Sequence, residues 1–519
     1  MSSQSDRTEY VTTDSGCKYS GNESSLIPIP CVFGQHEMGV LEACIELLDS
    51  CNLPTAKKGD PVSVTRAICR RIANITNTTP TKMTQSHYGG VFDTLRNFMK
   101  IGMLDIPDNL NSTAILVTVF RCLGLPSRSV TGINCAVETD LPMTVNVHYN
   151  DEGYSLDYLN NDKIWPSVSW VGVWMSRVDL PPGFGGWQEI MPWHSSLGPV
   201  PVYAIKKGQT YCCEGTQEHF FTLNADTKHW VVSKDGNMAL MKIQQRAAGL
   251  SIFTKAVGSM EPQDITKLYK FSEGCEEQKL AIHTAYMHCG RQNVIDESEM
   301  KNGDTKITLS TNPPVINFGN DVDVITKITN SSDFVRHLTV NLCGTVVAED
   351  GTPIMKLQKE TILAEVLANE SVDIPVKFNL GPYLHKLSPN CHLLFTAFGK
   401  IRELEEQYNI ATHYVGIKYP EIEIQIHGEF KVAGELTIVS RIRNPLPNLL
   451  LNSKLILTTS GLTPLHIVTN SGKSVGPWQV FKTERLYRCQ RPGKHTIVAS
   501  FTSDRMTGLM GIQDINIAC

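Results

Sequence analysis

Apolar residues recur at helical spacing in three segments near the start of the chain. Residues 41–53 and 60–75 place them along one side of a helix, so both segments are predicted to be amphipathic helices. Residues 112–128 are apolar on almost every side until Gly124 and Pro126 end the run. A helix that is apolar all round is a buried one, so this segment is predicted to lie inside the core.

Strand patterns appear next and then take over. Residues 143–149 and 219–225 are short segments whose composition is typical of strands. Beyond about residue 305, strands and turns replace the helical patterns. Residues 421–427 alternate strictly between apolar and polar positions, as a sheet with one solvated face requires.

The strand-rich part of the chain contains a repeat. Residues 324–330 (VITKITN) match residues 438–444 (IVSRIRN), and each copy is followed by an alternating strand, at 338–346 and at 454–461. A duplicated unit of about a hundred residues built from short strands is typical of an immunoglobulin-like sandwich. The pattern therefore predicts two successive all-β sandwiches.

The length of the chain, 519 residues, is too great for one ordinary core. Together with the change in pattern, it predicts an α+β core over residues 1–300, a first sandwich over 306–418 and a second over 419–519.

Composition narrows the classes of function. With 41% hydrophobic and 19% charged residues and a net charge of −5, the chain is expected to bind no nucleic acid. No apolar run is long enough for a transmembrane segment, and the first residues contain no secretory signal, so a cytoplasmic location is expected. The 15 cysteines, with Cys212 and Cys213 as the one adjacent pair, are interpreted as free thiols rather than as a disulfide framework or a zinc site.

Six short stretches carry the most specific signal in the sequence. They are Arg121-Cys-Leu-Gly-Leu-Pro-Ser-Arg128, Trp174-Met-Ser-Arg177, Asp179-Leu-Pro-Pro-Gly-Phe-Gly-Gly-Trp-Gln188, Ala204-Ile-Lys-Lys-Gly208, Thr254-Lys-Ala-Val-Gly258 and Asp264-Ile-Thr266. Together, in this order and followed by two sandwiches, they resemble the animal transglutaminases over nearly the whole chain. The resemblance implies a papain-like α+β core and two C-terminal β domains. The β-sandwich that precedes the core in the family is expected to be missing, since the family pattern begins near Tyr10.

The resemblance also implies a chemistry. In the family, a cysteine at the start of the buried helix attacks a glutamine carboxamide, a histidine accepts its proton and an aspartate orients the histidine. Ammonia leaves, and a lysine amine resolves the thioester into an isopeptide bond.

None of the three catalytic side chains is present at the matching positions. Counting back from the Arg121 motif places the nucleophile position at Asn109. The histidine position, between two tryptophans, is Val168, and the aspartate position, just after Trp187-Gln188, is Met191. Asparagine has no ionisable nucleophile, and valine and methionine cannot accept or orient a proton. The family's transition-state tryptophan falls on His87 or Tyr88.

A relocated active site is an alternative, because other polar side chains lie near these positions in sequence: Glu189, Ser112, Thr113, Cys122, Cys135, His148 and His194. Each has a simpler structural interpretation. Glu189, for example, is expected to be a solvated carboxylate on a strand, and Cys122 a buried thiol of the helix.

Calcium is the cofactor that the resemblance implies, and the family's calcium positions are only partly preserved. One loop maps to Glu138, Asp140, Pro142, Thr144 and Asp162. A second site maps to Asn224, Asp226, Gln245, Glu273 and Gln278. A third maps to residues 73–78, which contain no acidic residue. Since Ca²⁺ takes six to eight oxygen ligands, weak binding is expected at the second site, weaker binding at the first and none at the third.

Three hypotheses about function follow. The first is a catalytically inactive transglutaminase homologue that acts as a binding or scaffold protein for unidentified protein partners. The second is an active calcium-dependent protein-glutamine gamma-glutamyltransferase that uses non-standard residues. The third is an incomplete, nonfunctional product, whose uncovered core surface would promote aggregation.

Overall fold

The structure is a computed structural model that describes most of the chain. The described residues are 3–22, 25–75, 91, 94–95, 98–99, 102, 109–137, 143–192, 198–288, 304–387, 391–404, 408–464, 466–470 and 474–519.

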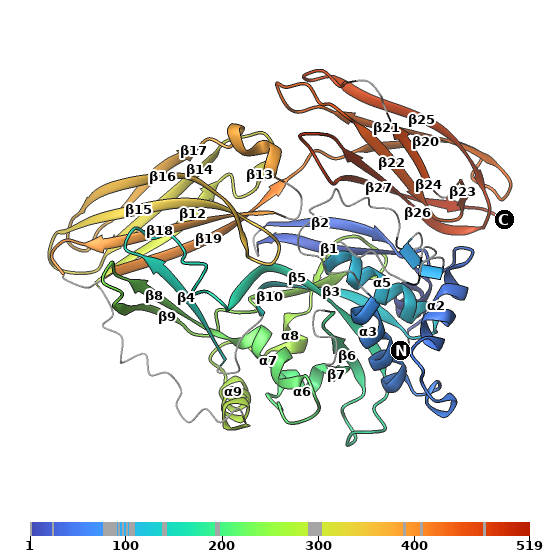
Figure 1. The fold of residues 1–519 in the computed structure, drawn as a ribbon, viewed down its shortest axis with the longest axis horizontal. Coiled ribbons are helices and arrows are strands. Elements are labelled where there is room, and N and C mark those ends of the chain that lie inside the picture. The colour runs from blue at the N-terminus through green and yellow to red at the C-terminus, as the bar shows by residue number, and fades with distance from the viewer. Residues whose placement is uncertain are drawn as a thin grey trace.

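The core is built on a six-stranded antiparallel sheet with the order β11-β10-β3-β5-β6-β7. Its strands are β3 (Ser127–Val137), β5 (Lys163–Met175), β6 (Gly186–Ile190), β7 (Val200–Pro201), β10 (Ser251–Lys255) and β11 (Pro262–Asp264). The long strands β3 and β5 lie at its centre and pass through the middle of the core (Figure 1).

The three predicted helices cover one face of this sheet. They are α2 (Val40–Asp49), α3 (Pro61–Ile75) and α5 (Asn109–Cys122). Residues 114–117, 119 and 120 of α5 pack against Val171, Val173 and Met175 of β5 in one apolar cluster. The prediction of a buried helix is therefore confirmed, because α5 lies between the sheet and its two neighbouring helices.

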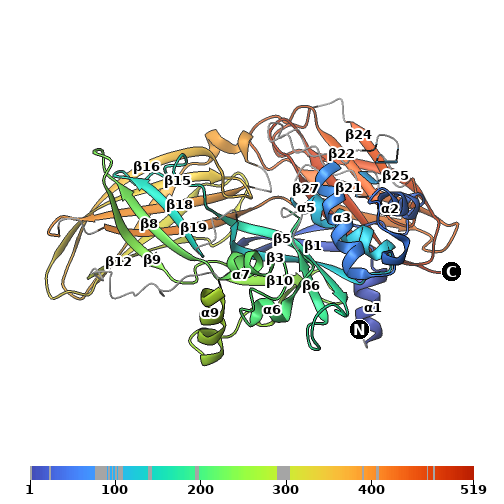
Figure 2. The ribbon, with the colours of Figure 1, turned by 60° about the horizontal axis from the view of Figure 1, so that its bottom comes forward.

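Short helices cover the opposite face: α6 (Val202–Lys206), α7 (Thr216–Asn224) and α8 (Thr266–Tyr269), with α9 (Glu276–His288) at the edge of the core (Figure 2). The strand prediction for residues 219–225 is wrong, because these residues form most of α7. Every residue from His219 to Asn224 is buried, so the segment has no polar side whose spacing would distinguish a helix from a strand.

A second core sheet has the order β4-β8-β9. Its strands are β4 (Thr144–Asn150), β8 (Asp226–Val232) and β9 (Met238–Gln244). The predicted strand at 143–149 corresponds to β4 and is confirmed.

The C-terminal part forms two β-sandwiches, as the repeat predicts. The first pairs the sheet β12-β14-β17 with the sheet β13-β19-β18-β15-β16, and the second pairs β20-β21-β25-β23 with β24-β22-β26-β27. Strand bounds in the first are β12 (Thr305–Asn312), β13 (Ile316–Asn317), β14 (Val322–Asn330), β15 (Arg336–Val347), β16 (Pro353–Val366), β17 (Ser371–Phe378), β18 (His392–Ile401) and β19 (Tyr408–Lys418), with a 3-10 turn η4 (Gly381–Lys386). In the second they are β20 (Glu423–Gly428), β21 (Glu435–Arg443), β22 (Lys454–Thr459), β23 (Leu462–Thr463), β24 (His466–Asn470), β25 (Val480–Cys489), β26 (Gly493–Thr502) and β27 (Leu509–Ile517).

The repeat extends to the role of one side chain. Asn330 and Asn444 hold matching places at the ends of β14 and β21, and each is 1% exposed. The amide of each donates to three backbone carbonyls, those of Phe334, Val366 and Leu367 for Asn330 and those of Asn448, Val475 and Gly476 for Asn444. Each asparagine thus supplies the hydrogen bonds that close the corner of its own sandwich.

A hairpin near the N-terminus joins the core to the first sandwich. It consists of β1 (Ser15–Asn22) and β2 (Ser25–Val32), and it lies between the core and both sandwiches (Figure 1). Alternate residues of β1 contact the first sandwich: Lys18 pairs with Glu349, Ser20 with His392, and Asn22 with the carbonyl of Tyr414. Cys17 and Tyr19 point the other way, into the core.

The second sandwich is held to the core by charged groups. Arg491 forms an ion pair with Glu37, whose Oε1 also accepts the Gly461 N–H at 3.1 Å. His495 lies 4.0 Å from Asp14. Both sandwiches therefore contact the core through buried or half-buried polar groups.

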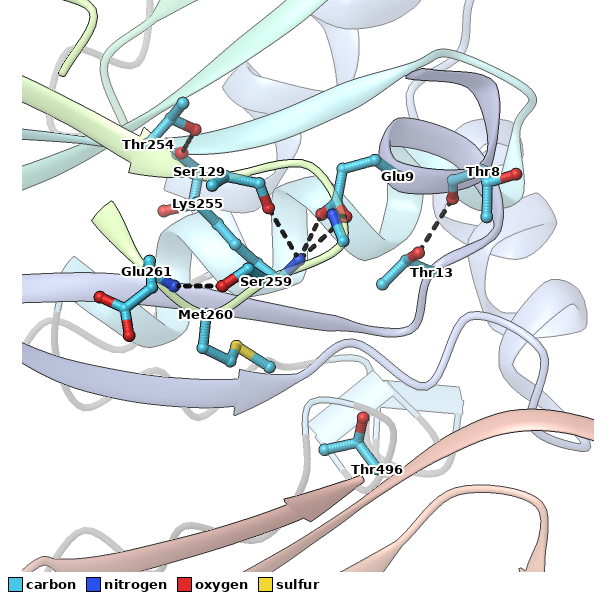
Figure 3. Close-up of polar contacts among 12 residues, drawn as sticks. Thr8, Glu9, Thr13, Ser129, Thr254, Lys255, Ser259, Met260, Glu261 and Thr496 are labelled. Carbon is cyan, nitrogen blue, oxygen red and sulfur yellow. Dashed lines mark hydrogen bonds and ion pairs between the residues drawn. The ribbon is translucent and has the colours of Figure 1, made fainter. Parts of the chain in front are cut away.

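The first residues of the chain pack onto the core. They form α1 (Gln4–Arg7) and a π-helical turn η1 (Thr8–Thr12). Farther along the chain, a 3-10 turn η2 (Thr55–Lys57) precedes α3. Both carboxylate oxygens of Glu9 accept from Lys255 Nζ, at 2.8 and 2.9 Å, and the pair is buried (Figure 3). Tyr10 meets the ring of Trp187 edge-on at 5.0 Å.

All cysteines within the described residues are free thiols. Over the same part of the chain, every helix is too short or too polar to span a bilayer.

Candidate functional site

Two of the three positions that match the family's catalytic residues lie together in the core. Val168, on β5, and Met191, just after β6, are 0% and 1% exposed. Both belong to one apolar cluster that also contains Val130, Trp170 and Tyr269. The nearest polar approach to Met191 that the structure gives is the hydroxyl of Thr222, 3.9 Å from its sulfur.

The third position begins the buried helix. Asn109 is the first residue of α5, and the structure describes its place in the helix but not its side chain. One turn later, Thr113 donates from Oγ1 to the Ser169 carbonyl at 3.1 Å, and Ser169 follows Val168 on β5. The start of α5 is therefore fixed against the part of β5 that carries Val168.

Among the described residues, Cys122, Cys135 and His148 do not come together as a nucleophile and base at this place. Cys122 ends α5, at the opposite end of the helix from Asn109, and Cys135 is fully buried, which raises the pKa of its thiol to about 12. His148 is bound to Asn160 on the edge of the second core sheet, with Nδ1 2.9 Å from Oδ1. His194, and His87 and Tyr88 at the tryptophan position, lie outside the described residues.

Glu189 is buried, and the expectation of a solvated carboxylate is wrong. Arg128, Gly172 and Glu189 face one another across β3, β5 and β6. A Cβ at position 172 would lie 3.2 Å from Glu189 Oε1 and 3.4 Å from Arg128 Nε, so the glycine leaves the space in which the two charged side chains approach. Tyr269 donates to Glu189 Oε1 at 2.8 Å.

Burial raises the pKa of Glu189 to about 7, while Arg128 and the hydrogen bond from Tyr269 act in the opposite direction. In the unfolded chain this carboxyl titrates near its ordinary value of about 4.3. Between these two values the folded chain binds more protons than the unfolded chain, so the free energy of unfolding falls as pH rises through this range.

Substitution Glu189→Gln is expected to remove this pH dependence. Relative to the variant, the unmodified chain should lose about 1–3 kcal/mol of unfolding free energy between pH 5 and pH 8. Urea denaturation at both pH values measures the difference, with the exposed Glu261→Gln as a control that should leave the profile unchanged. Parallel profiles for Glu189→Gln and the unmodified chain would show that the carboxyl titrates normally.

Four residues of the second calcium position are engaged by other groups, two of them by Arg246. Asp226 Oδ1 accepts the backbone N–H of Arg246 at 2.8 Å, and the Arg246 guanidinium lies 3.2 Å from Glu273. Asn224 donates to the carbonyl of Phe220, and Gln278 accepts from the N–H of Gly274. Gln245 directly precedes Arg246 in the chain. The Arg246 guanidinium pairs with Glu273 and its backbone N–H occupies Asp226 Oδ1, so this arrangement does not fit a Ca²⁺ ion, which takes six to eight oxygen ligands.

The other two calcium positions are described only in part. Asp162 is buried and accepts from the Asn146 backbone at 3.0 Å, and Thr144 begins β4. Glu138, Asp140 and Pro142 lie outside the described residues, as do residues 76–78 of the third position. Within the part of the chain that the structure describes, no three His, Cys, Asp or Glu side chains gather as metal ligands.

Calcium is therefore expected to have little effect on stability. About 1 mM Ca²⁺ should shift the melting temperature by less than about 1 °C, because a ligand stabilises a fold only when it exceeds its dissociation constant. Arg246→Ala removes the guanidinium from Glu273 while keeping the backbone N–H that Asp226 accepts, and this variant should respond to calcium more than the unmodified chain. A rise of several degrees in the unmodified chain would mean that a calcium site forms despite Arg246.

Comparisons with known proteins agree with the fold and with the sequence motifs. The family described as "Transglutaminase family, C-terminal ig like domain" matches residues 304–410. Protein-glutamine gamma-glutamyltransferase K of Canis lupus familiaris is 29% identical over 533 residues, covering 99% of this chain and 64% of its own length. Protein-glutamine gamma-glutamyltransferase 2 of Homo sapiens is 28% identical, covering 100% of this chain and 78% of that protein. The crystal structure of red sea bream transglutaminase superposes with a TM-score of 0.85 at 24% identity, over 100% of this chain and 79% of that one.

The chain belongs to the animal transglutaminase family. The fold class predicted from the sequence, a transglutaminase α+β core followed by two immunoglobulin-like sandwiches, is confirmed. The chain spans 64% of the length of the gamma-glutamyltransferase K from dog and human.

The buried group around Glu189 was not found as a site from the sequence. Its one signal is Gly172, a glycine in the middle of a long apolar strand, which often marks a place where another group approaches the backbone. Identifying that group requires the pairing of β3, β5 and β6.

Proposed function

We propose that this chain is a catalytically inactive transglutaminase homologue that acts by binding protein partners. The observation that supports the proposal most strongly is the packing of Val168 and Met191 in one buried apolar cluster. At the positions where the family's chemistry needs a proton acceptor and a group to orient it, these side chains offer only hydrocarbon and a thioether.

Energetics favour the same proposal. In a hydrolase whose catalytic residues act together, removing the nucleophile or its base lowers turnover by about a millionfold. In this chain, all three catalytic positions of the family carry other residues. The polar side chains that remain nearby are already used: Thr113 binds the backbone of β5, and Glu189 is held by Tyr269 and Arg128. At the second calcium position, the backbone N–H and the guanidinium of Arg246 already bind Asp226 and Glu273, the two carboxylates that would hold the ion.

The direct test is incorporation of a labelled primary amine into a glutamine-rich acceptor protein, with and without calcium. The purified chain is expected to give no more product than a boiled sample, while red sea bream transglutaminase gives product under the same conditions. Calcium-dependent incorporation above the boiled sample would favour the alternative, an active protein-glutamine gamma-glutamyltransferase that uses non-standard residues.

The other alternative, an incomplete and nonfunctional product, predicts different behaviour in solution. A functional binding protein is expected to remain dispersed and to melt cooperatively. Aggregation on purification, without a cooperative transition, would support the incomplete product instead. Protein partners, the absence of nucleic acid binding and a cytoplasmic location stay predictions.

A further inference from the structure

A cavity of about 600 Å³ lies between the core and the first sandwich. One wall is the core sheet β4-β8-β9 with the loop that follows β4, and the other is the sheet of β15, β16, β18 and β19. Both ribbon views place β8 and β9 beside β18 and β19 (Figures 1 and 2). A cavity of this size matches those that hold small organic ligands.

The core wall contains a buried hydrogen-bond acceptor, on the lining residue His229, that has no partner among the described residues. His229 is 4% exposed, and burial lowers the pKa of its imidazole to about 4, so the ring is neutral near pH 7. Its Nε2 lies 2.9 Å from Gln244 Oε1, which can only accept, so Nε2 carries the proton and Nδ1 does not. Among the described residues, the buried Nδ1 has no hydrogen-bond partner.

An aromatic surface lies next to this acceptor. The ring of Tyr149 stacks on that of His229, with centroids 5.9 Å apart and planes 24° apart, and both line the cavity. Tyr414 lines it from the opposite side. A flat ligand ring can therefore contact aromatic side chains from both walls.

The sandwich wall includes two rows of mostly uncharged side chains, several of which carry hydroxyl groups. Strand pairing aligns Thr412, Thr396 and Cys343 in one row and Tyr414, Leu394 and Thr345 in the next. Threonine hydroxyls both donate and accept, so this wall suits polar groups without imposing a charge.

Charge on the lining is balanced. The lining contains two carboxylates, those of Asp157 and Asp162, and two ammonium groups, those of Lys163 and Lys356, and burial lowers the pKa of His413 so that its ring is neutral near pH 7. Lys163 also lies 3.9 Å from Asp350. No cluster of one sign is present on this lining to favour an anion or a cation.

We propose that this cavity is a binding site for an uncharged aromatic ligand that donates a hydrogen bond to Nδ1 of His229. The ligand class is that of a capped aromatic amino acid: one flat ring, neutral amides and no net charge. Because its walls come from two domains, an occupant also holds the first sandwich against the core. The proposal does not depend on whether the chain has catalytic activity.

The test compares three probes that share the tyrosine side chain and differ in net charge through their end groups. Binding to the full chain is measured by saturation-transfer NMR for N-acetyl-tyrosinamide, which is neutral, for N-acetyl-tyrosine, which is anionic, and for tyrosinamide, which is cationic. The neutral probe is expected to bind with a dissociation constant below about 1 mM, and each charged probe at least about tenfold more weakly. No saturable binding of the neutral probe, or tighter binding of a charged one, would overturn the proposal.

Variants locate the binding. His229→Phe keeps a ring against Tyr149 but removes the acceptor, so binding of the neutral probe should weaken about tenfold. The exposed His283→Phe, on α9, is the matched control and should bind like the unmodified chain. Thr412→Val, at an exposed lining position, keeps the side-chain shape with little risk to folding and should weaken binding about threefold. Unchanged affinity in both His229→Phe and Thr412→Val would mean that the probe binds elsewhere.

Discussion

Glu349→Ala is expected to lower the free energy of unfolding by about 3–5 kcal/mol, the largest effect on stability that the structure predicts for a single substitution. Glu349 pairs with Lys18 where the hairpin β1-β2 meets the first sandwich, and the two side chains are 11% and 2% exposed. Without the carboxylate, a buried ammonium group remains beside His392, whose own pKa burial lowers to about 3. The substitution therefore leaves a buried lysine without the carboxylate that compensates its charge, which costs free energy.

A double variant separates this penalty from the net contribution of the ion pair to stability. Lys18→Met with Glu349→Leu replaces both charges by apolar side chains of similar size and should cost far less than Glu349→Ala alone. Urea denaturation followed by tryptophan fluorescence measures all the variants. If the double variant is as unstable as the single one, the charges matter less than the packing of their hydrocarbon chains.

The second large effect concerns activity. The triple variant Asn109→Cys, Val168→His and Met191→Asp is expected to regain amine incorporation at least about a hundredfold above the unmodified chain, yet to remain far below an active relative. Recovery is expected because Thr113 holds the start of α5 against the part of β5 that carries Val168, and because Val168 and Met191 share one cluster. It stays partial because Arg246 occupies a calcium position and the matching tryptophan is absent.

The matched control for this experiment keeps Asn109 and carries only the substitutions at 168 and 191. This control carries the same two polar side chains in the apolar cluster but has no thiolate, so it should give no product. Both variants should be less stable than the unmodified chain, because imidazole and carboxylate replace hydrocarbon at buried positions. A triple variant that melts cooperatively and still gives no product would show that position 109 is not placed for attack.

Much of the fold could be predicted because its signals are local. The all-round apolar character of residues 112–128 predicts α5, and the repeated pattern at 324–330 and 438–444 predicts the two sandwiches. Residues 219–225 were predicted wrongly because burial on every side removes the periodicity on which the prediction depends.

The site was only partly predictable for a similar reason. Motifs a few residues away fix positions 168 and 191 on the sequence, but their shared apolar cluster depends on how β5 and β6 pair and pack. The burial of Glu189 depends on an arginine two strands away, and the interdomain cavity on the docking of separate sheets. These features arise from contacts between distant segments, which one sequence does not specify position by position.

The central claim is that no side chain near the start of α5 can become an acylated nucleophile. Intact-mass spectrometry after incubation with a glutamine donor peptide and calcium tests it most directly, since an acyl-enzyme would add the mass of the peptide less ammonia. The account predicts a single species at the unmodified mass. A peptide adduct mapped to a side chain between Asn109 and Thr113 would contradict it.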